Sequence, residues 1–250
     1  MAFIEAASEP GMLLEDHLFY LPTTLTERWN YSEQHLGTIT ASYDDCPDYS
    51  WQITPSENEL VSLSDIRFEC DLVVMRHDGS TPLLDEDCIA PINNIMHSLF
   101  RSVTVELGGR SVSDQSNLYF LRSYLENLLG FSTDAQDTQL SCEGFRFDDD
   151  LTTPHCGAWQ AGVGNVPGTV TFSSTGARER YQMLMNGSPV QLSGKIHADL
   201  FQQDKPLLTG VPLFIKLTRA SNVLGFTART AALLPRVAIR NPKLYVRKFK

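Results

Sequence analysis

Residues 91–112 read "PINNIMHSLFRSVTVELGGRSV" and hold the signals that decide the fold class. The run "SVTVEL" alternates apolar and polar side chains, which predicts a strand with one buried face. Gly108 and Gly109 follow it, and because glycine readily adopts positive φ angles they predict a tight hairpin that returns through residues 111–113. Before the strand, a short helix is expected over Ile92–Leu99, with Pro91 in its first turn.

The same alternation recurs along the chain. In "IRFECDLVV" (66–74) every second residue is apolar from Ile66 onward, as in a strand with one buried face. Further strands are predicted at "GTVTF" (168–172), "KIHADL" (195–200), "PLFIKL" (212–217) and "PRVAIRNPKLYVRKF" (235–249), with weaker signals at "TITAS" (38–42) and "YSWQIT" (49–54). Pro242 is expected at a bulge or an edge of the last strand, because proline donates no ladder hydrogen bond.

Helices are few. "DQSNLYFLRSYLENLLG" (114–130) carries one stripe of leucines, with Asp114 or Ser113 expected as its cap and Gly130 as its end. The stripe consists of Leu118, Leu121, Leu125, Leu128 and Leu129. A further helix is expected in "TGARERYQMLM" (175–185).

Because helices and strands do not alternate regularly, parallel βαβ winding is disfavoured. The pattern instead predicts an all-β fold with inserted short helices, an antiparallel β-sandwich of jelly-roll type. Residues 1–36 show little periodicity and are expected to form an extended arm, and residues 37–250 are expected to form the jelly-roll domain.

The composition is that of a globular chain. Of 250 residues, 42% are hydrophobic and 20% charged, which suits a sizeable core. No apolar run approaches the ~18 residues of a membrane helix, and the first 20 residues lack the basic and apolar segments of a signal peptide. The chain is therefore expected not to be secreted and to keep its cysteines reduced. These are odd in number and irregularly spaced: Cys46, Cys70, Cys88, Cys142 and Cys156.

Charge is distributed unevenly. Residues 1–204 contain all 30 acidic residues and 10 of the 20 basic ones, a formal charge of −20, whereas residues 205–250 contain 10 basic residues and no acid. Two interpretations remain open. The basic side chains meet the acidic body of the same or a neighbouring subunit, or they face an acidic partner such as nucleic acid.

Loop motifs give little support for a cofactor or metal site. "GVGNVPG" (162–168) has a proline within it and a strand after it, so a turn is favoured over a dinucleotide loop. The aspartates at 148–150, with His155 and Cys156 nearby, lack the ligand spacing of calcium or zinc sites and are interpreted as a solvated loop.

Two histidines are candidates for chemistry. His197 and Asp199 stand two apart on the predicted strand 195–200 and suit an acid–base pair or, with Asp204, a metal site, but a surface pair or subunit contact is favoured. His97 is expected at a helix–strand junction, hydrogen-bonded to backbone. No Gly-x-Ser-x-Gly, phosphate-binding loop or His-Glu-x-x-His occurs in the sequence. We therefore assign no catalytic, cofactor-binding or metal residue from the sequence and expect no enzyme.

Several stretches in order resemble one family. "PINNIMHSLFRSVTVELGGRSV", "NLYFLRSYLENLLGF", "LSGKIHADLFQQDKPLLTGVPLFIKLTRA" and "LYVRKFK" are similar to the N-terminal half of the double jelly-roll major capsid proteins of Maverick/Polinton elements and adintoviruses. The arm motif "FYLPTTLT" and the stretch "YSWQITPSENELVSLSDIRFECDLVV" resemble the family's entry into its first strands. The resemblance spans most of residues 13–250.

The resemblance implies a structural role. Family members carry two tandem jelly rolls, and three copies form a pseudo-hexameric capsomer of an icosahedral shell around double-stranded DNA. Implied partners are further copies of the chain, minor capsid or penton proteins, and packaged DNA through the basic C-terminal stretch. The implied location is the virion capsid, assembled inside the host cell. The family continues into a second roll, so this sequence is expected to be either part of a longer protein or a single-roll relative.

Two other functions remain open. A host-retained binding module for carbohydrate or protein would use surface aromatics such as Trp29, Trp51 and Trp159. An enzyme of cupin type would hold a metal with His155, His197 and carboxylates, but the clustered His-x-His spacing of such sites is absent.

Overall fold

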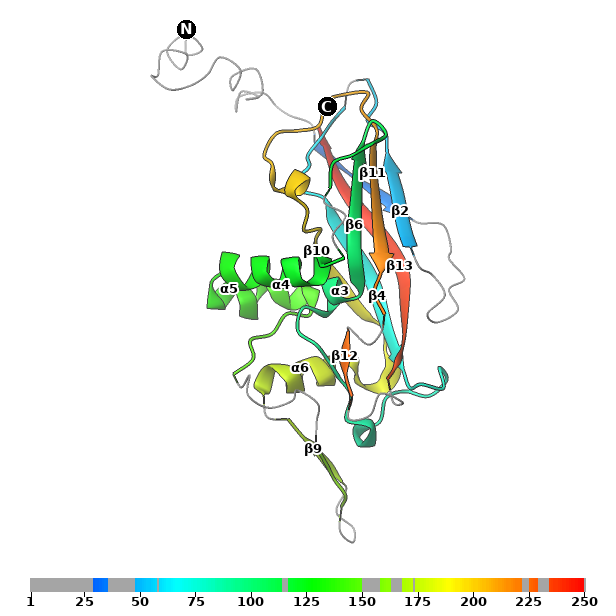
Figure 1. Ribbon diagram of the computed structural model, residues 1–250, viewed down its shortest axis with the longest axis vertical. Coiled ribbons are helices and arrows are strands. Elements are labelled where there is room, and N and C mark those ends of the chain that lie inside the picture. The colour runs from blue at the N-terminus through cyan, green and yellow to red at the C-terminus, as the bar shows by residue number, and fades with distance from the viewer. Residues whose placement is uncertain are drawn as a thin grey trace.

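Two antiparallel sheets pack face to face in the computed structural model (Figure 1). The structure describes residues 29–35, 48–57, 59–113, 117–149, 158–162, 168–172, 174–221, 225–228 and 234–249. The first sheet has the order β1-β13-β4-β10, with β3 also paired to β13, and the second has the order β2-β11-β6-β7. Their strands are β1 (Trp29–His35), β2 (Asp48–Ile53), β3 (Leu60–Val61), β4 (Arg67–Met75), β6 (Phe100–Leu107), β7 (Arg110–Ser111), β10 (Val190–Lys195), β11 (Leu213–Arg219) and β13 (Arg236–Phe249).

Helices and two small ribbons occupy the connections of this sandwich. The ribbons pair β5 (Ala90–Pro91) with β12 (Phe226–Thr227), and β8 (Ala158–Gln160) with β9 (Thr169–Thr171). The α-helices are α3 (Ile95–Ser98), α4 (Tyr119–Gly130), α5 (Thr133–Asp137) and α6 (Thr175–Leu184), and the 3-10 helices are η1 (Asp85–Asp87), η2 (Gln139–Glu143), η3 (Met185–Gly187) and η4 (Asp199–Gln202). Figure 1 shows α4 and α5 projecting sideways from the middle of the sandwich, with α6 below them.

The core lies between the two sheets because each strand buries alternate side chains. Phe68 of β4 is buried, and its ring packs edge-on at 5.6 Å from the rings of both Trp51 and Phe100 in the opposite sheet. Such edge-to-face pairs add to the free energy gained by burying apolar area. The fold is an antiparallel jelly-roll sandwich with few short helices, as the alternation predicted.

Most strand predictions are confirmed. β4, β6, β11, β13 and β2 coincide with predicted segments to within two residues. Gly108 and Gly109 have φ angles of 55° and 79° in the turn between β6 and β7. The register of β13 against β4 shifts between Arg240 and Lys243, which places Pro242 at the expected irregularity. "GTVTF" forms β9 of a separate ribbon, and "TITAS" lies outside the described residues.

The strand predicted over residues 195–200 is wrong. β10 ends at Lys195, and Asp199–Gln202 form η4. The backbone N–H of Ala198 donates to the carbonyl of Ile196, and that of Phe201 donates to Ala198. These local turns replace the ladder, while Ile196 and Ala198 remain buried. The side chains of this segment therefore alternate between buried and less buried positions although the segment is not a strand.

Two helix starts also differ from the prediction. α3 begins at Ile95 rather than Ile92, because Asn94 adopts a φ of 58° and Pro91 pairs with Phe226 in a ribbon. α4 begins at Tyr119 after Leu118, which makes no side-chain cap. Ser113 instead accepts the N–H of Val105 with its hydroxyl. Asp114 lies outside the described residues, and α6 confirms the last helix prediction.

The proposed domain boundary stays a prediction, since residues 1–28 and 36–47 lie outside the described part. Residues 29–35 form β1, which pairs with β13, so the sheet includes residues that the sequence assigned to the arm. Cys70, Cys88 and Cys142 form no disulfide. Among the described residues, no helix has the length and apolar character to cross a membrane.

Candidate functional site

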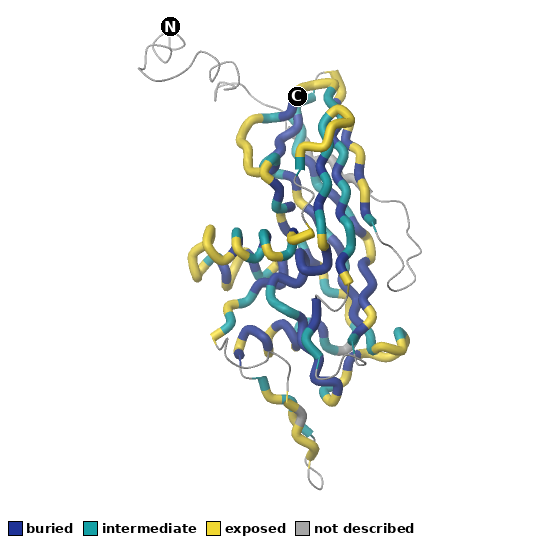
Figure 2. The backbone as a smooth tube through the Cα atoms, in the orientation of Figure 1, coloured by how far each residue is buried: buried dark blue, intermediate teal, exposed yellow. Residues whose placement is uncertain are grey.

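Helix α4 turns its polar side inward. Its buried residues are Tyr119, Ser123 and Asn127, which recur every four positions and so share one face. The leucine stripe lies on the opposite side and is exposed, with Leu129 81% accessible. Figure 2 shows α4 as mostly exposed along its outer side, whereas the neighbouring strands are largely buried. We name the outer side the leucine face, comprising Leu118, Leu121, Leu125, Leu128, Leu129 and the following Phe131.

Beneath the polar side of α4, three side chains converge from separate elements. His97 comes from α3, Glu143 from the end of η2, and His197 from the segment after β10. One nitrogen of each imidazole and one oxygen of the carboxylate all lie within 4.8 Å of one another. The two imidazole rings meet edge to face with centroids 4.7 Å apart. The arrangement is a compact donor set of two imidazoles and one carboxylate.

Helix α4 holds the outer atoms of this set. Nδ1 of His197 donates to Oε2 of Glu126 at 2.7 Å, and Nδ1 of His97 is 2.9 Å from the hydroxyl of Tyr119. Asn127 donates its amide to Oε2 of Glu143 at 2.9 Å. Each of the three converging groups therefore has one partner on α4, so this helix fixes their orientation.

Burial sets the charges of the cluster. Burial lowers the pKa of His97, although its bond to Glu143 opposes this effect. Burial alone would raise the pKa of Glu143, but the hydrogen bonds from His97 and Asn127 and the nearby imidazoles outweigh it, so this pKa lies below its usual value. At neutral pH a neutral His97 therefore donates Nε2–H to an ionised Glu143, over 3.3 Å. Its Nδ1 then accepts the hydroxyl proton of Tyr119.

Two buried acceptor atoms in this region are left over. Nε2 of His197 and Oδ1 of Asn127 are enclosed and have no hydrogen-bond partner among the described residues. Because Nδ1 of His197 donates to Glu126, Nε2 carries the lone pair whenever the ring is neutral. Native structures rarely leave buried polar atoms unsatisfied, so each such atom needs an explanation.

Close backbone approaches bring the three elements together. A Cβ atom on Gly194 of β10 would lie 2.5 Å from Cγ and Oε1 of Glu143, so only a glycine lets this side chain cross the strand. Gly144 ends η2 with a φ of 75°, and a Cβ there would lie 2.4 Å from Ile95 of α3. The tight packing of η2 against α3 and β10 depends on these two glycines.

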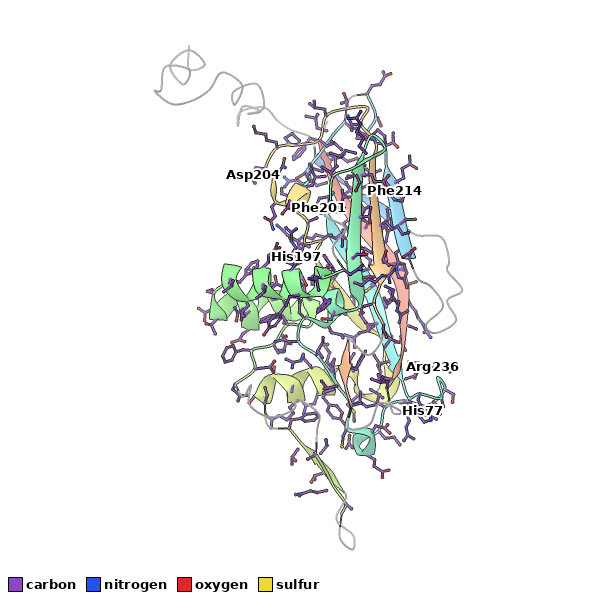
Figure 3. The ribbon with its side chains drawn as sticks, in the orientation of Figure 1. His77, His197, Phe201, Asp204, Phe214 and Arg236 are labelled. Atoms are coloured by element: carbon purple, nitrogen blue, oxygen red, sulfur yellow. The ribbon has the colours of Figure 1, made fainter. Side chains whose placement is uncertain are left out.

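A groove opens beside the cluster. It encloses about 630 Å³ between the outer end of α4 and the segment after β10, and it is lined by apolar side chains that include Leu125, Leu129, Phe131 and Phe201. Glu126 and His197 also line it. Figure 3 shows His197 next to α4, with Phe201 and Asp204 farther along the same segment. The leucine face thus continues into a groove that reaches His197.

A second buried polar cluster lies against α6. Arg180 is 1% exposed, and its Nη2 donates to both carboxylate oxygens of Asp148 at 3.0 and 3.1 Å. Its other guanidinium nitrogens donate to the carbonyls of Pro91 and Arg146. Asp148 also accepts from Asn93 and Ser174. The solvated-loop interpretation is therefore wrong for Asp148, because Arg180, far along the chain, compensates its charge; Asp150, His155 and Cys156 lie outside the described residues.

The histidine predictions are corrected in part. His97 does lie beside a helix–strand junction, but its ring bonds to side chains rather than to backbone. His197 does not pair with Asp199, because Asp199 in η4 forms an ion pair with Arg122. His197 bonds to Glu126 instead. Asp204 is exposed on the loop beyond η4.

Glu143 and Glu126 were not predicted as site residues from the sequence. Each stands far from the histidines in sequence, and neither belongs to a spaced motif. One signal was present: Tyr119, Ser123 and Asn127 form a second, polar stripe beside the leucines. Trp51 is buried at 4% exposure and offers no surface for stacking a sugar, while the side chains of Trp29 and Trp159 lie outside the description.

The basic C-terminal stretch pairs with acidic residues elsewhere in the chain. Lys216 of β11 contacts Asp48 at 2.8 Å, and in β13 Arg247 and Lys248 contact Asp65 and Glu59 at 3.0 and 3.3 Å. These contacts favour the interpretation that this stretch meets the acidic body of its own chain.

A solved structure shares this fold. The chain aligns with a chain of the Sputnik virophage, from its cryo-EM structure, at a TM-score of 0.54 and 10% identity over 88% of its own length. It spans 47% of that Sputnik chain. A quasi-atomic model of the PBCV-1 virus capsid gives a TM-score of 0.45 at 13% identity, over 92% of this chain and 44% of the other.

Sequence comparison gives little more. An uncharacterized protein of Caenorhabditis elegans is 29% identical over 65 residues, which make up 26% of this chain and 16% of the worm protein. No protein-family model matches the sequence. The likeness to the Sputnik chain supports the fold alone.

Proposed function

We propose that the chain is a structural subunit of a viral capsid, of the type found in Maverick/Polinton elements and adintoviruses, and not an enzyme. It acts by self-association, as part of a trimeric pseudo-hexameric capsomer in an icosahedral shell around double-stranded DNA. The jelly-roll likeness to a virophage chain and the ordered sequence resemblance support this assignment.

The observation that carries the proposal is the leucine face. Six large apolar side chains on and beside α4 are exposed, although the same helix buries a polar stripe. Contiguous exposed apolar area is unfavourable in a free monomer and marks an interaction surface. In the proposed shell, a second copy of the chain covers this face, and the free energy of assembly comes from the apolar area removed from water.

The remaining contacts follow from the family. The chain spans 47% of the Sputnik chain, and its sequence resembles the N-terminal half of the capsid family, so we assign the residues at hand to a first roll. Minor capsid or penton proteins would adjoin the capsomers, and the shell would assemble inside the host cell. Because at least three of its cations are already paired, we expect the C-terminal stretch to contribute little to DNA binding.

The native mass of the purified chain tests the proposal. Light scattering over a concentration series is expected to show a trimer or a larger closed assembly. The double variant Leu125→Asp/Leu129→Asp should shift the population to monomer, because it places two charges in the covered face. A matched variant, Leu84→Asp, alters an apolar residue of similar exposure outside α4 and should assemble as the native chain does. A native chain that stays monomeric at every concentration contradicts the proposal.

A further inference from the structure

We propose that His97, Glu143 and His197 form a zinc-binding site that ties α3, η2 and the segment after β10 together beneath α4. The site goes beyond the proposed role in assembly and does not depend on it. Two imidazole nitrogens and one carboxylate oxygen within 4.8 Å of one another supply three ligands, and water supplies the fourth.

The chemistry of the donor set selects the ion. Imidazole nitrogen suits zinc and related transition metals, whereas calcium and magnesium prefer sites built from oxygen. Ligand atoms about 2.0–2.2 Å from a tetrahedral zinc stand roughly 3.4 Å apart. Nε2 of His97 and Oε2 of Glu143 are already 3.3 Å apart. Small movements of the third side chain therefore complete the set.

The unpartnered lone pair of His197 is the observation that points to a ligand. Its Nε2 is buried without a hydrogen-bond partner among the described residues, and the whole side chain is 10% exposed. A bound cation satisfies a buried lone pair that no donor in this part of the chain reaches. When the metal takes the place of the proton on Nε2 of His97, the neutral ring carries its proton on Nδ1 instead and donates it to the hydroxyl of Tyr119.

The outer partners match those of a metal site. A ligating histidine usually donates its other ring nitrogen to a carboxylate or another acceptor, which fixes the ring and raises its basicity. His197 donates Nδ1–H to Glu126 at 2.7 Å, and Nδ1 of His97 lies 2.9 Å from the hydroxyl of Tyr119. Asn127 in turn donates its side-chain amide to Oε2 of Glu143. The groove of about 630 Å³, which His197 lines, gives the ion and its water a path from solvent.

Titration of the chelator-treated chain with zinc chloride, followed by calorimetry, tests the site. We expect one equivalent of zinc per chain. Glu143→Gln and His197→Gln each remove a ligand at nearly constant size, and they should weaken binding by more than the 10- to 100-fold typical of losing an outer partner. Glu126→Gln removes such a partner and should cost about 10- to 100-fold.

His77→Gln is the matched control, because His77 is an exposed histidine of the loop after β4, away from the cluster (Figure 3). It should bind zinc as the native chain does. Cobalt in place of zinc should give the visible absorption of a four-coordinate site in the native chain and lose it in His197→Gln. If Glu143→Gln fails to fold, His197→Gln decides. Absence of stoichiometric binding by the native chain, or unchanged binding by His197→Gln, overturns the proposal, whatever the native mass of the chain.

Discussion

Two buried polar clusters lie beneath the helices of this sandwich, and they differ in how completely they are satisfied. Around Arg180 and Asp148, all three guanidinium nitrogens donate, and the carboxylate accepts from Arg180 and from two further side chains, Asn93 and Ser174. Around His97, Glu143 and His197, two buried atoms, Nε2 of His197 and Oδ1 of Asn127, have no hydrogen-bond partner among the described residues. In the first cluster, which we call the closed cluster, the protein supplies the hydrogen-bond partners of both charged groups. In the second, which we call the open cluster, an additional atom could bind to the unsatisfied nitrogen of His197.

The difference separates a structural role from a ligand-binding one. A buried ion pair with complete hydrogen bonding fixes a chain path, here the path of residues 91–93 and 146–148 against α6. A cluster with a spare lone pair and a compact donor set has a position for a cation. Burial alone does not distinguish the two, because both clusters are nearly inaccessible to solvent.

The largest effect is expected in the closed cluster. Asp148→Asn leaves the Arg180 charge buried without a counter-ion, and breaking such a pair typically costs about 3–5 kcal/mol of the free energy of unfolding. Urea denaturation followed by circular dichroism measures the loss. Asp137→Asn, on the exposed end of α5, should change stability by no more than about 0.5 kcal/mol. A loss below about 1 kcal/mol for Asp148→Asn would mean that water reaches Arg180 in solution.

Zinc should stabilise the open cluster selectively. At a free zinc concentration 100-fold above the dissociation constant, binding to the folded chain adds about 2.7 kcal/mol to its free energy of unfolding. Thermal melts with zinc and with chelator measure this increment. His197→Gln should abolish the increment, whereas Asp148→Asn, if folded, should retain it. Equal increments in all three proteins would place the zinc elsewhere.

Gly194→Ala probes how Glu143 is held. The added methyl group would lie 2.5 Å from Glu143, so the carboxylate must leave its position or β10 must shift. Overpacking of this kind costs about 1–3 kcal/mol, and the zinc increment should shrink with it. Gly130→Ala is the matched control, since a Cβ there has open space. Native zinc affinity in Gly194→Ala would show that the clash is relieved by a shift of β10 and not by movement of Glu143, and the zinc affinity of Glu143→Gln then decides whether Glu143 is a ligand.

Much of the sandwich was predictable because its signals are local. A strand with one buried face repeats every two residues, so β4, β6 and β13 could be recognised from the sequence alone. Residues 195–200 show where this rule fails. The alternation of Ile196 and Ala198 reflects burial, which an irregular segment beside a sheet edge also provides.

The open cluster was not predictable, since its members meet only through tertiary packing. Glu143 lies 46 residues from His97, and their encounter depends on Gly194 and Gly144 rather than on a motif. The sequence of α4 contains both a leucine stripe and a polar stripe. The sequence does not determine which stripe faces inward, because the orientation of the helix depends on the polar side chains that other elements place beneath it.

The smallest effect on folding is expected at the leucine face. Leu129 is 81% exposed, so Leu129→Asn removes little buried area and should change the free energy of unfolding of the monomer by no more than about 0.5 kcal/mol. Its effect on assembly should be larger, because the same side chain is covered when a second copy docks. Denaturation at low concentration and light scattering at high concentration separate the two quantities.

The buried residue Asn127, two positions earlier, gives the contrasting outcome. Asn127→Leu places an apolar side chain on the inner side of α4 and removes the amide that donates to Glu143. Because the buried carboxylate then lacks one hydrogen bond, the free energy of unfolding should fall by about 1–3 kcal/mol. Assembly of the folded fraction should be unchanged. If Leu129→Asn instead destabilised the monomer as much as Asn127→Leu, the leucines would be packed inside the subunit. The assembly proposed here would then lose its contact surface, while the zinc site beneath the helix would be unaffected.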